Sequence, residues 1–190
     1  MPEGHVIHRL ADGLEQVFSG RTVRVSSPQG RFADAAALLD GRPFLGAEAY
    51  GKHLFLEIGD SSVVHIHLGL IGKLRLAGPQ PVASPDTLRL RIETPEATAE
   101  LRGPQTCALI TPGERDAVVA GLGPDPLRAD ADPERGWARV SRSERSIASL
   151  LLDQRVAAGV GNIFRCEVLF RQRLHPMTPG RSLTGRRWQR

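Results

Sequence analysis

Short segments of alternating apolar and polar residues fill the chain between positions 21 and 112, and they restrict the fold more than any other feature. A period of two is the pattern of a strand with one buried face, and Gly and Pro residues between the segments are typical of turns. The expected elements are a short helix at 33–39 and strands at 21–26, 43–50, 53–58, 63–68, 73–76, 88–93, 98–102 and 107–111. Many short strands with such turns indicate a β-sandwich or barrel.

Helical periodicity precedes this region. Residues 3–19 carry apolar side chains at the spacing of one helix face, and Gly20 is suited to end that helix in a left-handed conformation. The apolar positions are Val6, Ile7, Leu10, Leu14, Val17 and Phe18. The fold class is therefore α+β, and its N-terminal part is a β-sandwich with flanking helices.

A second helical region follows residues 122–136, which are rich in Pro, Asp and Gly and are typical of a linker. Helices are expected at 146–154 and 162–172, and a further helix begins at 183–190. Four apolar side chains of the 162–172 helix are expected to face inward: Ile163, Val168, Leu169 and Phe170.

The length of 190 residues allows one domain or two small ones. We expect an N-terminal domain at 1–121 and a helical domain at 137–190, joined by the linker. No apolar run approaches the roughly 18 residues that span a bilayer. Glu3 and Asp12 interrupt the first apolar pattern, so it is not a signal peptide, and we expect a cytoplasmic protein.

The charge of the chain is unevenly distributed. Residues 1–128 hold 13 Lys and Arg against 15 Asp and Glu, whereas residues 129–190 hold 12 against 6. All twelve basic residues of the second part are Arg. Because the guanidinium group matches phosphate oxygens in a bidentate manner, this distribution favours a polyanionic partner. A solvated basic surface remains the alternative.

The first residues place a nucleophile beside an acid. If Met1 is removed, Pro2 presents a free secondary amine, and the carboxyl group of Glu3 follows at once. The helix that begins here has a partial positive charge at its N-terminus, which should lower the pKa of the amine from its usual value of about 8. The alternative is structural, since Pro and Glu both favour the first turn of a helix.

Three motifs together resemble the Fpg/Nei family of DNA glycosylases, the bacterial enzymes that excise oxidised bases. The first is the start MPEGHVIHRLA, which resembles the endonuclease VIII branch, and the second is GKHLFLE with HIHLGLIGKLR, which resembles the sandwich strands of the family. The third is LGPDPL with LLDQRVAAGVGNIF and EVLFRQRLHP, which resembles the family's linker and helix-two-turns-helix motif. The resemblance implies that 1–121 is catalytic and that 137–190 binds DNA.

The resemblance also implies a reaction. Pro2 would attack the sugar C1′ of a damaged nucleotide, and Glu3 would act as general acid on the sugar ring oxygen. The iminium cation would then allow β,δ-elimination, which leaves a gapped strand. The expected partner is damaged double-stranded DNA carrying an oxidised base, with oxidised pyrimidines preferred, and the expected protein is a monomer.

Two further residues match phosphate-contacting positions of the family. Lys52 matches the lysine of the active site, although a solvated hairpin lysine is the alternative. Asn162 matches the asparagine beside the flipped nucleotide, although it could instead be the N-cap of the following helix. Both roles are compatible, because the exposed N–H groups at a helix N-terminus also bind phosphate.

Leu70 matches the apolar wedge with which the family separates stacked bases. It lies between Gly69 and Gly72, which would let the tip of the turn project. The alternative is an ordinary hydrophobic hairpin residue.

His65 and His67 alternate along one strand and face the same side. This could indicate a metal site, but the sequence offers no third ligand. We therefore expect them to be structural or to face phosphate.

Two positions depart from the formamidopyrimidine branch. Residues 102–107 lack its Arg-Phe pair, which probes the opposite base, and Val6 stands where that branch has a further glutamate. The missing pair favours the endonuclease VIII branch and leaves the opposite-base contact unassigned, and at Val6 we assign no third carboxylate.

Family members continue into a C-terminal zinc finger or a zincless equivalent, whereas this sequence stops at Arg190. The only cysteines, Cys107 and Cys166, are far apart and form no CxxC pair, which favours free buried thiols. We therefore expect a helix-two-turns-helix domain that is incomplete, with no zinc finger, no metal and no cofactor.

Two other functions remain compatible with the residues. A non-catalytic DNA-binding fragment would explain the Arg-rich helical part combined with the missing finger. An enzyme that uses an N-terminal proline as a base, as tautomerases do, would have no need of that basic part.

Overall fold

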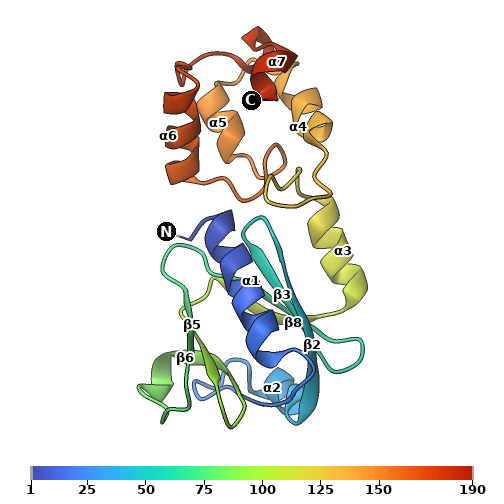
Figure 1. Ribbon diagram of the computed structural model, residues 1–190, viewed down its shortest axis with the longest axis vertical. Coiled ribbons are helices and arrows are strands. Elements are labelled where there is room, and N and C mark those ends of the chain that lie inside the picture. The colour runs from blue at the N-terminus through green and yellow to red at the C-terminus, as the bar shows by residue number, and fades with distance from the viewer. Residues whose placement is uncertain (1, 190) are drawn as a thin grey trace.

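The structure is a computed structural model, and it describes residues 2–189. Figure 1 shows an elongated molecule with a sheet-containing half and a smaller helical half, and the first helix begins where the two halves meet. We refer to these as the sheet half and the helical half. Among residues 2–189, no helix has the length and hydropathy that crossing a bilayer requires.

The sheet half is an antiparallel β-sandwich, as the alternation predicts. Its strands are β1 Thr22–Ser26, β2 Arg42–Tyr50, β3 His53–Ile58, β4 Val63–His67, β5 Lys73–Ala77, β6 Leu88–Glu93, β7 Thr98–Arg102 and β8 Thr106–Ile110. Their order is β5-β7-β6-β1-β2-β3-β4-β8. Strands β1 and β2 are paired only at Thr22↔Pro43 and Val23↔Arg42, so the sheet divides there into two layers.

Helix α1, Gly4–Phe18, packs its apolar face into the core between these layers (Figure 1). The expected spacing is confirmed, because Ile7, Leu14 and Phe18 are buried. Strand β3 is buried on both faces. Its even-numbered residues join α1 in the main core, and Phe55 faces a smaller cluster formed with α3, Pro112–Ala120.

The helical half has its own core. Its helices are α4 Pro133–Val140, α5 Ile147–Leu152, α6 Asn162–Arg171 and α7 Gly185–Trp188. The core residues are Val140, Ile147, Leu150, Leu151, Val156, Leu169 and Leu183. The remaining short elements are α2 Ala33–Leu39 and the 3₁₀ turns Pro85–Thr87 and Gly180–Ser182.

The prediction for the inward face of α6 is largely wrong. Leu169 is buried, but Ile163 and Val168 are about half exposed and Phe170 is 82% exposed. Helix α6 packs mainly against α5, so it buries a narrower side than its apolar pattern suggests. Periodicity gives the width of an apolar stripe but not which part of it finds a partner.

The segment 122–136, which we expect to be a linker, contains the start of a helix and packed residues. Its last residues form the first turn of α4, where Asp132 accepts a hydrogen bond from the backbone N–H of Glu134. Asp125 is 1% exposed and Gly136 is buried, so the segment is packed rather than free. Helix α3 is not predicted from the sequence, because its first residues, Pro112 and Gly113, are typical of a turn. It begins with a capping box between Thr111 and Glu114.

A buried arginine joins β6 to β7. The Arg91 side chain is 6% exposed, and its guanidinium donates to Glu93 and to Glu100, each at 2.6 Å, and to the carbonyl of Gln80. Such a group is stable only while its partners are in place, because loss of one partner leaves a buried charge uncompensated.

We predict that Arg91→Met lowers the free energy of unfolding by about 1 to 3 kcal/mol, since the Glu100 carboxylate then keeps only Arg102 as a cation and one of its buried oxygens loses its donor. Chemical denaturation monitored by circular dichroism measures this. Arg24→Met is the matched control, because Arg24 is 81% exposed and lies 3.7 Å from the same Glu93. The control should cost less than about 1 kcal/mol, and equal losses would contradict the assignment.

Candidate active site

The carboxylate of Glu3 joins the two halves. Glu3 is 0% exposed and is the N-cap residue of α1, yet its side chain does not cap that helix. Its oxygens accept hydrogen bonds from the backbone N–H groups of Gly161 at 3.1 Å, Ile163 at 2.7 Å and Phe164 at 3.1 Å. A carboxylate at this position interacts favourably with the free N–H groups and the dipole of α6.

This contact corrects two expectations about Asn162. The N-cap of α6 is Gly161, and Asn162 is the first helical residue, so Asn162 is not the cap. The N–H groups expected to bind phosphate are occupied, since three of them bind Glu3. Asn162 is exposed beside this site, and only its side chain remains for the expected phosphate contact.

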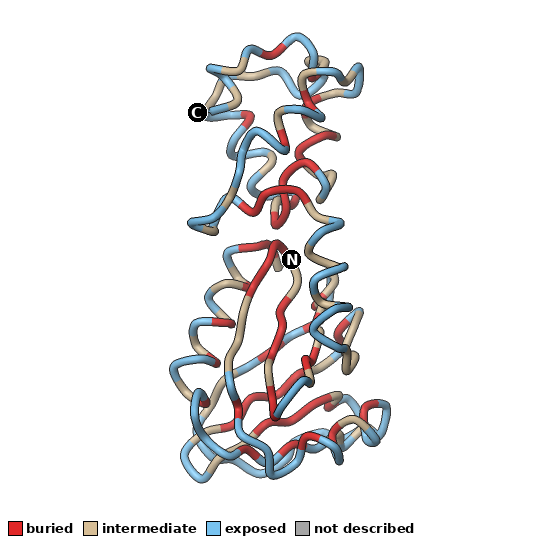
Figure 2. The backbone as a smooth tube through the Cα atoms, turned by 90° about the vertical axis from the view of Figure 1, so that its right-hand side faces the viewer, coloured by how far each residue is buried: buried red, intermediate tan, exposed pale blue. Residues whose placement is uncertain are grey.

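Three glycines bring the backbone segments into direct contact at the same place. Gly4 donates to the carbonyl of Gly159 at 2.9 Å. A Cβ on Gly159 would lie 3.2 Å from Cα of Gly4 and 3.3 Å from Cα of Gly51, and Gly159 and Gly51 both have positive φ. No other residue fits these positions without moving the segments apart. Figure 2 shows buried backbone on both sides of this junction.

Pro2 and Lys52 line a single cavity of about 130 Å³, together with Leu70 at its rim. His67 and Gln105 complete its polar lining. The structure therefore brings together three of the five expected site residues, and Glu3 lies next to Pro2 in the chain. Asn162 does not line this cavity.

The Lys52 ammonium group is half-buried in this cavity. Burial lowers its pKa from the ordinary value, and the nearby negative charge of Glu3 partly offsets this. A lysine with a lowered pKa releases a proton more readily near neutral pH. The residue is thus not the solvated hairpin lysine of the alternative interpretation.

The turn that carries Leu70 projects, as its glycines predict. Leu70 is 75% exposed and its neighbour Ile71 is equally accessible. Gly69 has φ +67°, and Gly72 donates to the carbonyl of Leu68 at 3.1 Å, which closes the turn. A large apolar side chain at an exposed tip suits the wedge role, which stays a prediction.

The histidines form a cluster of three. His53 pairs with His67 across β3 and β4, and the Nδ1 atom of His53 lies 2.8 Å from the Nε2 atom of His65. Burial lowers the pKa of all three side chains, and that of His53 falls to about 4 because the other two imidazoles add to the effect. Within residues 2–189, no group of His, Cys, Asp or Glu is arranged to hold a metal ion. The two cysteines are free and far apart: Cys107 lies in β8, and Cys166 is exposed on α6.

Sequence reasoning missed several of these residues. His53 could have been found, since the short hairpin at 59–62 sets His53 opposite His67. Asp125 gave no signal except its place in the LGPDPL motif. The partner of Glu3 could not be found from spacing, because the contact links residues about 160 positions apart.

We predict that Glu3→Gln lowers the free energy of unfolding by about 1 to 3 kcal/mol, because the amide nitrogen cannot accept from the α6 N–H groups. Urea denaturation measures this loss. Glu15→Gln is the control, since Glu15 accepts one exposed bond from the N–H of Ala47 at 2.7 Å. A loss no larger than that of Glu15→Gln would contradict the structural role of Glu3.

We predict that acid destabilises the protein through His53. Its folded pKa of about 4 lies below the ordinary 6.5, so between these values the unfolded chain binds more protons. Stability is therefore complete above pH 6.5 and falls as the pH drops toward 4, by about 2 to 3 kcal/mol for this residue. His53→Gln should flatten the curve of unfolding free energy against pH, and parallel curves would contradict the prediction.

Comparison with known protein families assigns nearly the whole chain. Residues 1–108 match the family described as the Formamidopyrimidine-DNA glycosylase N-terminal domain. Residues 122–190 match the Formamidopyrimidine-DNA glycosylase H2TH domain.

Curated relatives and solved structures agree. The chain is 50% identical over 187 residues to Endonuclease 8 1 of Mycobacterium tuberculosis, covering 96% of this chain and 70% of that protein. It is 37% identical over 185 residues to Endonuclease 8 2 of Mycobacterium bovis, covering 94% of this chain and 71% of the relative. A crystal structure of Lactococcus lactis Fpg (MutM) bound to N7-Benzyl-Fapy-dG containing DNA has the same fold, with a TM-score of 0.85 at 24% identity over 99% of this chain and 74% of that one.

Proposed function

From the premise that this chain belongs to the Fpg and endonuclease VIII family of DNA glycosylases and AP lyases, we propose that it removes oxidised bases, preferentially pyrimidines, from double-stranded DNA in base-excision repair. The observation that carries the proposal is the cavity shared by Pro2, Lys52 and Leu70. A nucleophile, a cation and a wedge in one cavity are what chemistry on a flipped nucleotide requires. The similarity to the mycobacterial endonucleases 8 supports the preference for pyrimidines, as does the absence of an Arg-Phe pair at 102–107.

Pro2 acts as the nucleophile in this proposal. Its nitrogen lone pair forms a bond to the sugar C1′, and the electron pair of the glycosidic bond leaves with the base. Opening of the sugar ring gives an iminium cation, since a secondary amine keeps its positive charge on condensation. That cation withdraws electrons, so a proton is lost from C2′ as the C3′–O bond breaks and the 3′-phosphate departs. A second proton is then lost from C4′ as the C5′–O bond breaks and the 5′-phosphate departs.

Glu3 and Lys52 serve this reaction from two sides. Glu3 transfers protons to and from the sugar oxygen, and α6 holds its carboxylate in place. Lys52 neutralises the phosphate beside the damaged nucleotide, and its lowered pKa also suits it to proton exchange in the cavity. Neither role needs a metal or another cofactor.

The rest of the chain delivers DNA to the cavity. Leu70 fills the gap left by the extruded nucleotide, and the side chain of Asn162 holds a neighbouring phosphate. We assign residues 1–121 to a catalytic domain and residues 137–190 to DNA binding, with 122–136 connecting them. The twelve Arg residues after position 128 supply contacts that depend on phosphate rather than on base sequence.

We predict that borohydride traps the protein on a duplex with an abasic site or an oxidised pyrimidine, because the iminium between Pro2 and C1′ is reducible. Intact mass of the same sample shows whether Met1 is absent, as the proposal requires. Peptide mapping identifies the amine that carries the adduct, since the sequence offers only two amines besides that of Pro2, those of Lys52 and Lys73. The adduct is expected on the N-terminal peptide.

Two outcomes would contradict the proposal. An adduct on a lysine peptide would remove Pro2 from its role. No adduct from a chain that begins at Pro2, with binding retained in gel-shift titrations, would leave only the DNA-binding alternative, whose affinity should fall steeply with salt.

A further inference from the structure

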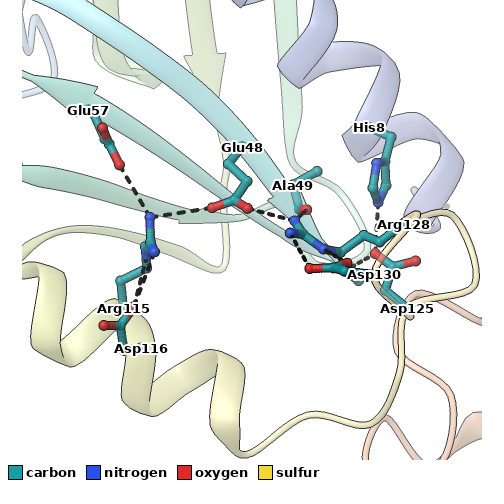
Figure 3. Close-up of polar contacts among 10 residues, drawn as sticks. His8, Glu48, Ala49, Glu57, Arg115, Asp116, Asp125, Arg128 and Asp130 are labelled. Carbon is teal, nitrogen blue, oxygen red and sulfur yellow. Dashed lines mark hydrogen bonds and ion pairs between the residues drawn. The ribbon is translucent and has the colours of Figure 1, made fainter. Parts of the chain in front are cut away.

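Asp125 is a buried carboxylate that the proposed reaction does not use. Its Oδ2 atom lies 2.7 Å from the Nε2 atom of His8 and also accepts the N–H of Gly51 at 2.7 Å. Its Oδ1 atom accepts the N–H of Leu127 at 3.0 Å. Figure 3 shows His8 reaching from α1 to Asp125, which lies in the segment that leads into the helical half.

The imidazole of His8 is the donor in this pair. An ionised carboxylate can only accept, so the Nε2 atom of His8 carries the hydrogen. The His8 side chain is 22% exposed and Asp125 is 1% exposed, which places most of the contact away from water. A hydrogen bond to a buried carboxylate is strong, and its loss leaves the carboxylate with backbone donors alone.

The hydrogen bond from the N–H of Gly51 to Asp125 connects the His8–Asp125 pair to the cavity. Gly51 precedes Lys52 directly, and its φ of +59° fixes a tight turn between β2 and β3. A Cβ at Gly51 would lie 3.0 Å from the Cβ of Ala158, so the turn is also confined by the helical half. Fixing the peptide of Gly51 therefore fixes the direction in which Lys52 leaves the backbone.

We propose that His8 and Asp125 are positioning residues for the glycosylase reaction. His8 holds the Asp125 carboxylate, and Asp125 holds the Gly51–Lys52 turn so that the Lys52 amine points into the cavity beside Pro2. The inference rests on the proposed function for its effect on rate, whereas the placement of Lys52 can be measured without any activity.

The kinetic test uses single-turnover excision on a duplex with an oxidised pyrimidine. His8→Leu should slow the chemical step about tenfold or more while the Kd for the DNA changes little, since small misplacement of a reacting group is costly. His8→Gln should restore most of the rate, because its amide can donate to Asp125. Equal losses in His8→Leu and His8→Gln would overturn the proposal.

A double-mutant cycle separates positioning from general stability. If His8 acts through Lys52, then adding His8→Leu to Lys52→Ala should slow the reaction by no more than about twofold. If the double variant instead loses rate by the product of the two single-variant factors, His8 does not act through Lys52. Arg115→Gln is the control, because Arg115 binds Glu48 on β2 and Glu57 on β3 but lies away from His8 and Asp125 (Figure 3). A rate loss in this control equal to that of His8→Leu would also overturn the proposal.

The second measurement remains informative if the protein shows no excision at all. The chain has two lysines, so protein labelled at the lysine ¹³Cε position gives two NMR signals, and exposed Lys73 is an internal reference. Three titratable groups face Lys52: Glu3, which raises the pKa of Lys52, His67, whose own pKa is lowered by Lys52, and the amine of Pro2 in the same cavity. The pKa of Lys52 should lie below the ordinary lysine value in the parent and in His8→Gln, and should rise toward that value in His8→Leu. An unchanged Lys52 titration in His8→Leu would overturn the positioning role, whereas absence of excision in the parent would count only against the proposed function.

Discussion

The contact between the Glu3 carboxylate and the N-terminus of α6 is the interaction on which the site depends. One buried carboxylate takes three backbone donors from a helix about 160 residues away. Without it, the buried carboxylate and the buried N–H of Gly161 would lose their partners, which costs several times what an ordinary surface contact contributes. The residue proposed for proton transfer is therefore also the residue that joins the two halves.

Two other sets of contacts lie at the same junction between the halves. The glycines at positions 4, 51 and 159 let three backbone segments touch, and Asp125 ties α1 to the turn before Lys52. Pro2 lies at the centre of these contacts because it is adjacent to Glu3. The cavity itself is lined by residues of the sheet half, but Glu3 beside Pro2 and the Gly51 turn before Lys52 both pack against the helical half. Changes that loosen the junction are expected to affect chemistry and stability together.

Local patterns in the sequence predict much of this fold. Alternation locates the strands to within a residue or two, and the helical spacing of residues 3–19 locates α1, because both patterns report which side of an element is buried. The motifs single out Pro2, Lys52 and Leu70, and these three residues line one cavity. What remained hidden depends on packing between distant segments. The occupied N-terminus of α6, the exposed Phe170 and the position of Asp125 follow from which surfaces meet, and no local pattern records that.

Hydrogen exchange at the start of α6 tests the central contact most directly. The N–H groups of Ile163 and Phe164 have no acceptor within their own helix, so an unliganded helix N-terminus would exchange them rapidly. If Glu3 joins the halves as described, these two amides and that of Gly161 should exchange nearly as slowly as the amides of β3 in the sandwich core. Rapid exchange of all three, while β3 stays protected, would contradict the account.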